Sequence, residues 1–354
     1  MEQMPYPLNL YFTHVQDVTT LDLSRGEDDY RKIFIAEDES RKIVIKQCSN
    51  SFSNRHRIEG WFKLMDAYRS LGIYCPAIVP TLSGEQIHED FVENRSSCVF
   101  AEEFAKYKTV EQIGLDQLRD SSGKMIFLAD LLRSLGKVAN ARLDLLNFPS
   151  AYCLLEPFSP PDRVDEATDC AELFREYVDK ELPEYSEKVQ SLLRLFYQNQ
   201  EALREIYSQL PTSCFQADLN DSNILLDEDH CFVGLIDFNL CGREPVLNYT
   251  VREALWNVRD YCLYGANGER LYYYNQDLDK KRIDLFLQNM SYIQEYYEFS
   301  KAEREAFPIL FRYINSFWWH QIDEIKRVKD HPEKVLQIFD WLAFQMTRSD
   351  VQLL

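Results

Sequence analysis

The stretch "FQADLNDSNILLDEDHCFVGLIDFN", residues 215–239, carries the strongest structural signal in the chain. Its two apolar runs, Ile224–Leu226 and Phe232–Ile236, are separated by an acidic turn. Short β-favouring runs around such a turn are typical of two paired antiparallel strands. The stretch therefore predicts a β-hairpin.

Polar side chains stand at both ends of this predicted hairpin. Asp218 and Asn223 come just before it, and Asp237 comes just after it. Because strand pairing brings the two ends of a hairpin together, we expect these three side chains to converge at one point.

Two interpretations fit this convergence. In the first, the three residues only shape turns, where Asp and Asn are common. That interpretation does not explain why an acid directly follows the buried-looking run "VGLI". In the second, Asn223 and Asp237 bind Mg²⁺, which takes oxygen ligands. Asp218 then remains free of the metal, to orient an attacking hydroxyl and accept its proton during phosphoryl transfer from ATP.

The order of these residues resembles a known family. Asp218-Leu-Asn-Asp-Ser-Asn223, followed by Ile236-Asp237-Phe238, is similar to the catalytic loop and metal strand of the aminoglycoside phosphotransferase and choline kinase family, within the protein-kinase-like fold. The resemblance covers about Leu23 to Phe344. It implies a phosphotransferase that uses ATP and Mg²⁺ and moves the γ-phosphate to a hydroxyl of a small molecule. Asp218 would be catalytic, and Asn223 and Asp237 would be the metal ligands.

Two positions depart from the family pattern. The usual histidine of the catalytic loop is Gln216 here, and the acid that usually follows I-D-F is Asn239. The family's histidine braces the loop by hydrogen bonding. Glutamine can donate a similar bond, so we expect activity to survive. Asn239 leaves an additional metal contact undecided.

The resemblance also implies a cation at the α- and β-phosphates, a helix acid that holds this cation, and backbone contacts to adenine. Lys46, at the end of "KIVIK", suits the first role, and Glu59 of "RIEGWFKL" suits the second. In "VFAEEFA", the Glu103 carbonyl and the Ala105 amide are the predicted adenine contacts.

The character of the chain changes at about Lys106. Before it, "YRKIFIA" and "RKIVIKQ" read as strands and "SNRHRIEGWFKLMDAYRSLG" as a helix. After it, long amphipathic stretches predict helices, and "EPFSPPDRVDEATDC" reads as a loop. We predict an α+β, two-lobed protein-kinase-like fold. Residues 1–105 would form the nucleotide-binding lobe, and residues 106–354 the catalytic and substrate-binding lobe.

Composition narrows the class of protein. The chain has 354 residues, of which 45% are hydrophobic, and a formal net charge of −19. Such a surface repels nucleic acid and anionic membrane, so we expect neither as a partner. The sequence shows no apolar run of transmembrane length and no secretory signal. Nine cysteines without paired spacing fit reduced thiols, so we expect a cytoplasmic protein.

The net charge also fits a cationic small-molecule substrate, such as an aminoglycoside, an amino sugar, choline or an amino alcohol, although solubility alone is the simpler explanation of the charge. Trp256 and Trp319 suit cation–π contacts with an ammonium group, and with Asn220 they are the predicted substrate-binding residues. Choline kinases carry two tryptophans three residues apart, but Ile322 holds the second place here. Trp319 also fits ordinary packing in a helical core.

Other classes of function remain open. A nucleotide-binding pseudokinase or interaction module would be expected to lack Asp218, Asn223, Asp237 or Lys46, and none of these is lost. A protein-serine kinase is disfavoured, because the chain lacks an HRD triplet, a glycine-rich loop and an A-P-E segment. The sequence determines neither the choice between ATP and GTP nor the oligomeric state.

Overall fold

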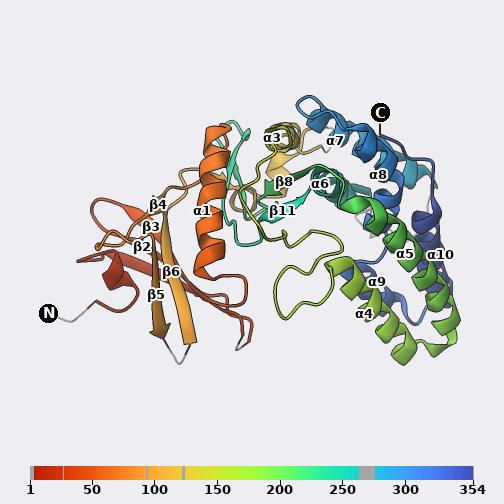
Figure 1. The fold of residues 1–354 in the computed structure, drawn as a ribbon, viewed down its shortest axis with the longest axis horizontal. Coiled ribbons are helices and arrows are strands. Elements are labelled where there is room, and N and C mark those ends of the chain that lie inside the picture. The colour runs from red at the N-terminus through yellow and green to blue at the C-terminus, as the bar shows by residue number, and fades with distance from the viewer. Residues whose placement is uncertain (1–3, 27, 93–94, 122–123, 263–275, 354) are drawn as a thin grey trace. The chain divides into compact units, whose positions relative to one another are not determined.

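The computed structural model describes residues 4–26, 28–92, 95–121, 124–262 and 276–353. The chain divides into two compact units (Figure 1). The first unit comprises Met1–Leu128, Ser159–Pro161 and Asp218–Cys241, and the second comprises Ala129–Phe158, Asp162–Ala217 and Gly242–Leu354. Strands dominate the first unit and helices the second, as an α+β chain requires.

An antiparallel sheet forms most of the first unit. Its strands are β1 (Asp17–Asp22), β2 (Tyr30–Glu37), β3 (Lys42–Ser49), β4 (Ile78–Val79), β5 (Ile87–Val92) and β6 (Arg95–Glu103). They lie in the order β1-β2-β3-β6-β4, with β5 also paired to β6. The strands predicted from "YRKIFIA" and "RKIVIKQ" are confirmed as β2 and β3. The polar strand β1 gave no clear signal because its residues are almost all exposed.

Helix α1 (Arg55–Ser70) covers one face of this sheet, as the sequence predicted. The side chain of Asn54 caps its first turn by accepting a hydrogen bond from the Arg57 amide. Its apolar stripe packs on the sheet, where Trp61 and Phe62 make edge-to-face contacts with Phe100 of β6. The other face is covered by the N-terminal segment, which includes a 3₁₀ turn at Leu8–Leu10. Two packed faces hold β3 and β6 rigidly in the middle of the sheet.

The hairpin predicted from residues 215–239 is confirmed. Strands β9 (Ile224–Leu226) and β10 (Phe232–Leu235) pair with each other, and β9 pairs with the short strand β7 (Lys108–Thr109). The Tyr74 amide donates to the Val233 carbonyl at 2.8 Å, and the Leu235 amide donates to the Tyr74 carbonyl at 2.9 Å. These bonds join the hairpin to the first unit, which therefore extends beyond the boundary expected at residue 105. The short helices α2 (Val110–Ile113) and Leu115–Leu118 belong to the same unit.

Gly234 allows the hairpin to approach Tyr74 this closely. A Cβ atom at position 234 would lie 2.1 Å from the Tyr74 carbonyl oxygen, which is backbone and has no room to move aside. Gly234→Ala is therefore expected to destabilise the protein by about 1–3 kcal/mol, the usual effect of overpacking. Urea unfolding measures this loss. Gly84→Ala, at a turn with nothing within 4 Å of the added Cβ but with a φ of +89°, measures the cost of backbone strain without overpacking. Equal stability of Gly234→Ala and the wild type would contradict the close approach.

The second unit is mainly helical. Its helices are α3 (Leu128–Ala141, which starts at the last residue of the first unit), α4 (Glu166–Glu181), α5 (Ser186–Tyr207), α6 (Val246–Cys262), α7 (Gln276–Gln294), α8 (Lys301–Ile314), α9 (Trp319–Val328) and α10 (Pro332–Thr347), with a 3₁₀ turn at Pro183–Tyr185. Strands β8 (Thr212–Phe215) and β11 (Gly242–Pro245) form a separate antiparallel pair. The predicted loop ends sooner than expected, because Asp165 caps α4 by accepting from the Thr168 amide at 2.8 Å. Within the described ranges, no helix has the length and apolarity needed to cross a membrane.

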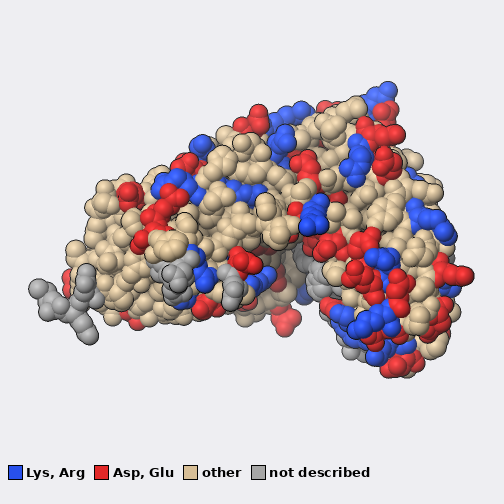
Figure 2. Space-filling view, turned by 60° about the horizontal axis from the view of Figure 1, so that its bottom comes forward, with Lys and Arg blue, Asp and Glu red and all other residues tan. Residues whose placement is uncertain are grey.

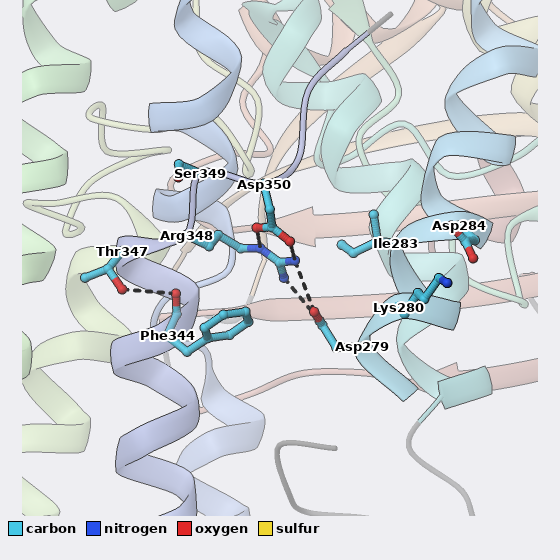
Figure 3. A pocket seen from close by; sticks show the side chains of 9 residues that line it. All are labelled: Asp279, Lys280, Ile283, Asp284, Phe344, Thr347, Arg348, Ser349 and Asp350. Carbon is cyan, nitrogen blue, oxygen red and sulfur yellow. Dashed lines mark hydrogen bonds and ion pairs between the residues drawn. The ribbon is translucent and has the colours of Figure 1, made fainter. Parts of the chain in front are cut away.

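A buried arginine fastens the end of the chain to the second unit (Figure 3). Arg348, which follows α10, donates to both carboxylate oxygens of Asp279 on α7, at 3.0 and 3.1 Å. It also donates to both oxygens of Asp350, at 2.9 and 3.0 Å, and to Gln345 at 3.2 Å. A cavity of about 570 Å³ adjoins this cluster. Because every guanidinium nitrogen already has an acceptor, the cluster is a structural clamp.

Glu244 of β11 is a buried acid in the second unit. It is 1% exposed and accepts hydrogen bonds from the Ser150 hydroxyl and from Asn248 Nδ2, the latter at 3.2 Å. Burial raises the pKa of Glu244 to about 7, although Ser150, the charge of Arg252 and Asn248 act to lower it. The folded protein therefore holds a proton that the unfolded chain releases at a lower pH.

Glu244→Gln is expected to remove a pH dependence of stability. The carboxyl titrates at 4.5 in its ordinary state and at about 7 in the folded protein, so the free energy of unfolding falls as the pH rises between these values. Above pH 7 the destabilisation is complete and is on the order of 3 kcal/mol. Urea unfolding at pH 5 and pH 8 tests this. The variant should gain stability over the wild type at pH 8 but not at pH 5, and an equal difference at both values would refute the assignment.

Candidate active site

The loop before the hairpin holds the carboxylate of Asp218 in a fixed position. One carboxylate oxygen accepts from Asn220 Nδ2 at 2.9 Å, and the other accepts from Asn223 Nδ2 at 2.9 Å. Asn220 is itself oriented by the Ser222 amide, which donates to its Oδ1 at 3.0 Å. Asp218 is thus positioned by side chains of its own loop.

Strand pairing places Asp237 beside this loop. The Ile236 amide donates to the Asn223 carbonyl at 3.0 Å, so Asp237 follows directly after the pair that closes the hairpin. Asp237 has a φ of +55°, in the left-handed region that few residues other than glycine adopt. This conformation turns the chain sharply at the end of β10. Non-glycine residues held in this way are concentrated at functional sites.

Lys46 of β3 joins the same cluster. Its ammonium lies 3.2 Å from Glu102 of β6 and 3.5 Å from Asp237. Burial acts to lower the pKa of Lys46, but the charges of Glu102 and Asp237 outweigh it and raise the pKa well above its ordinary value. The lysine therefore remains a cation. The structure thus brings Lys46 and Asp237 together, although they lie far apart in the sequence.

The ion pair expected between Lys46 and Glu59 is not formed in the structure. Glu59 lies 3.9 Å from Arg55, one helical turn earlier, and its side chain is about half exposed. The side chain of Glu102 is only 8% exposed and holds the ammonium of Lys46 instead. The physical reason is the register of β3 and β6. Lys46 is opposite Phe100, so Glu102 is its diagonal neighbour on the same face of the sheet.

The electrostatics of Asp218 suit a proton acceptor. Burial and then the nearby charge of Asp237 raise the pKa of Asp218 to about 6, while the bonds from Asn220 and Asn223 act to lower it. The carboxylate is therefore ionised at neutral pH and more basic than an ordinary aspartate. A general base operates best with a pKa close to the working pH.

The oxygen atoms of Asn223 and Asp237 fit the needs of Mg²⁺. Asn223 directs its amide nitrogen to Asp218, which leaves its oxygen with one long hydrogen bond from the Ser222 hydroxyl, at 3.4 Å. Among the described residues, no three His, Cys, Asp or Glu side chains gather as a metal cage. Mg²⁺ is usually held by one or two protein oxygens together with waters and substrate phosphates. The donor set here is therefore suitable for a magnesium nucleotide.

The predicted adenine contacts fall at the end of β6. Glu103 is the last residue of this strand, and its amide donates to the Ala77 carbonyl at 2.8 Å. Ala105 lies two residues further on, after the strand has ended. Contacts from the Glu103 carbonyl and the Ala105 amide to adenine remain predictions.

The structure describes the side chain of only one of the three predicted substrate-binding residues. Asn220 contacts Asp218, as described above. Trp256 belongs to α6 and Trp319 begins α9, but both side chains lie outside what the structure describes. The neighbouring Trp318 is buried, at 3% exposure, and its ring packs against the guanidinium of Arg252. This tryptophan therefore has a packing role in the helical core.

Sequence reasoning missed Glu102 and Ser222. A glutamate within the apolar run "CVFAEEFA" was a signal that a buried acid has a cationic partner. The sequence does not show which cation, because strand register decides the partner. Ser222, which bonds Asn220 and Asn223, lies within the quoted motif but reads as an ordinary turn residue.

Comparison with known families identifies the class of enzyme. Residues 22–248 match the phosphotransferase enzyme family. Because this match spans more than half of the chain, the chain belongs to that family. The predicted family and the predicted enzyme class, a phosphotransferase, are confirmed. A search of curated protein sequences gives no match.

Solved structures support the fold. A microcompartment-associated aminopropanol kinase is similar with a TM-score of 0.51 and 14% identity, over 96% of this chain and 93% of the other. An amicoumacin kinase in complex with AMP-PNP and Ca²⁺ gives a TM-score of 0.51 and 14% identity, over 96% of this chain and 90% of the other. At this level of identity the likeness concerns the fold alone. It confirms the predicted α+β kinase-like class.

Proposed function

We propose that this protein transfers the γ-phosphate of ATP, as its magnesium complex, to a hydroxyl of a small cationic molecule. The observation that carries the proposal is the cluster of Asp218, Asn223 and Asp237 around one end of a hairpin, with Lys46 ion-paired to Asp237. Phosphoryl transfer needs little covalent chemistry from a protein. It needs charge at the phosphates and a positioned acceptor, and this cluster contains groups of both kinds.

Each residue has a separate task in this proposal. Asn223 and Asp237 hold Mg²⁺, which neutralises charge on the phosphates when it is bound. Lys46 places a permanent cation beside them. Asp218, whose carboxylate is held by its own loop, orients the acceptor hydroxyl and takes its proton. Asn220 and Asn223 keep the carboxylate of Asp218 in the required orientation.

The acceptor is proposed to carry an amine. The net charge of −19 attracts cations at long range. On the face shown in Figure 2, acidic and basic side chains are interspersed, so this face does not gather the negative charge into one patch. Amino alcohols and aminoglycosides combine a hydroxyl with an amine, and the aminopropanol kinase named above acts, by its printed name, on an amino alcohol. We include amino sugars in the same class, together with choline, whose quaternary ammonium group is also cationic.

A nucleotide-binding pseudokinase remains the alternative function. Gln216 is the departure that favours it, since the usual brace of the loop is replaced. The hydrogen bonds from Asn220 and Asn223 to Asp218 favour a catalytic role, because an aspartate that no longer takes part in catalysis would not need a fixed orientation.

A thermal-shift screen tests the class of acceptor. The protein is incubated with Mg²⁺ and a non-hydrolysable nucleotide, and hydroxylated amines and sugars are added one at a time. Ligands that bind the folded state raise its unfolding temperature. We expect amino alcohols or aminoglycosides to do so more than uncharged sugars. Stabilisation by sugars alone would contradict the cationic class while leaving phosphoryl transfer intact.

Lys46→Ala is expected to weaken magnesium nucleotide binding and to lower the rate of transfer, each by about 10-fold or more, because a charge at the phosphates assists both ground state and transition state. Calorimetry and a turnover assay measure the two effects. Lys42→Ala is the matched control, since Lys42 starts the same strand and pairs with Glu37 at 3.3 Å. Wild-type affinity and rate in Lys46→Ala would remove Lys46 from the site.

A further inference from the structure

The first unit contains a small cavity beside Lys46. It has a volume of about 60 Å³, and Arg31, Lys46, Trp61, Asp237 and Asn239 are among the residues that line it. Arg31 comes from β2, Lys46 from β3 and Trp61 from α1, so three separate elements form the wall. All of these residues belong to the first unit.

Buried polar atoms in this wall lack partners. Among the residues that the structure describes, the indole N–H of Trp61 and the Nε–H of Arg31 have no hydrogen-bond acceptor. Trp61 is only 4% exposed, so bulk water does not reach its ring. Buried donors are rarely left unpaired in folded proteins, because the lost hydration is not recovered. Two such donors at one cavity indicate that an acceptor belongs there.

The charge of the cavity indicates which acceptor it takes. Arg31 and Lys46 are cations, and with the indole of Trp61 they supply only donors. Asp29 satisfies one nitrogen of Arg31 at 2.7 Å, but the Nε atom remains without a partner. A group with several acceptor oxygens and a negative charge can accept from all three side chains at once, whereas the oxygen of a single water molecule accepts at most two hydrogen bonds.

One acceptor in the same wall also lacks a partner. The side-chain oxygen of Asn239 has no donor within the described part of the chain. A water bound to the oxyanion or to its metal can donate to this oxygen. Asp237 lines the same cavity and is the proposed magnesium ligand. The wall therefore suits an oxyanion that is accompanied by a hydrated cation.

We propose that Trp61 and Arg31 donate hydrogen bonds to a phosphate group of the nucleotide in this cavity, next to Lys46. The inference rests on the proposed function and assigns two positioning residues to it. Neither the motif nor its spacing indicates these two residues. Trp61 reads as part of an apolar helical stripe, and Arg31 reads as a surface charge.

Trp61→Phe tests the proposal, because phenylalanine keeps an aromatic ring against Phe100 but removes the indole N–H. Calorimetry measures the affinities of the full-length protein for magnesium ADP, magnesium pyrophosphate and adenosine. We expect about a 10-fold loss for the two phosphate ligands, as for a hydrogen bond to a charged group, and no change for adenosine. Arg31→Lys keeps the charge, removes the Nε donor and should show the same selective loss. Trp341→Phe is the matched control, because it removes an indole from α10 in the second unit. This variant should bind all three ligands like the wild type.

A second readout observes the hydrogen bond itself. In ¹⁵N-labelled protein, the indole resonance that is missing in Trp61→Phe belongs to Trp61, and it should move downfield when magnesium pyrophosphate is added. Unchanged affinity of Trp61→Phe for the two phosphate ligands would overturn this inference but would leave the proposed function intact. So would an equal loss for adenosine, which would show a packing role for the indole. A wild-type protein that binds no magnesium nucleotide would overturn the proposed function as well.

Discussion

Replacing Asp237 with alanine is expected to lower phosphoryl transfer by about 10³-fold or more. The substitution removes the only carboxylate among the two proposed metal ligands, and metal ions contribute several kcal/mol to the stabilisation of charge in the transition state. It also removes one of the two carboxylates that contact Lys46, while Glu102 remains at 3.2 Å. The cation therefore keeps a partner, and the fold should persist.

The control for this variant lies in the same hairpin. Asp229→Ala removes the same charge from the exposed turn between β9 and β10, away from the site. We expect this variant to retain the wild-type rate. Circular dichroism checks that both variants are folded. An Asp237→Ala protein with a rate close to the wild type would show that Asp237 is a turn residue rather than a metal ligand.

Asp218→Asn is expected to lower turnover by about 10²–10⁴-fold, the usual contribution of general acid–base and positioning groups. Asparagine has nearly the same shape, but it has no negative charge and is not a base. Its amide nitrogen also loses one of the two bonds that Asn220 and Asn223 donate to the carboxylate. Magnesium nucleotide affinity should change little, because Asp218 faces the acceptor in the proposed mechanism.

The pH dependence of the wild type provides a second check on Asp218. Its pKa of about 6 means that the carboxylate becomes protonated as the pH falls through that value. Turnover should therefore decline below about pH 6, or somewhat lower when Mg²⁺ is bound, since a nearby cation favours the charged form. Near-full turnover by Asp218→Asn, or a wild-type rate that is constant from pH 8 to pH 4, would show that Asp218 only shapes the turn and is not the base.

The sequence predicted the hairpin and its polar ends because that information is local. The spacing from Asp218 to Asn223, and the position of Asp237 after an apolar run, follow from strand pairing alone. The partner of Lys46 was not predictable in this way. It depends on the register between β3 and β6, which brings together Lys46 and Glu102 from positions 56 residues apart, and a shift of two residues would have offered Lys46 a different neighbour.

Local sequence patterns also did not indicate which of the two units the hairpin belongs to. The hairpin follows the helical segments in the sequence, so it was expected in the larger lobe. The structure joins it to the first unit through Tyr74 and β7, at contacts that arise only in the folded chain. Gly234, which permits this approach, reads in the sequence only as an interruption of a strand.

The central claim is tested most directly by phosphoryl transfer itself. The wild type and Asp218→Asn are incubated with Mg²⁺ and ATP labelled at the γ-phosphate, in parallel with GTP, and with a panel of amino alcohols and aminoglycosides. Labelled product is separated and counted, with and without a chelator. We expect a phosphorylated acceptor with the wild type, at least about 100-fold less of it with Asp218→Asn, and none once Mg²⁺ is removed. Nucleotide binding by the wild type without transfer to any acceptor, or equal transfer by Asp218→Asn, would contradict the central claim.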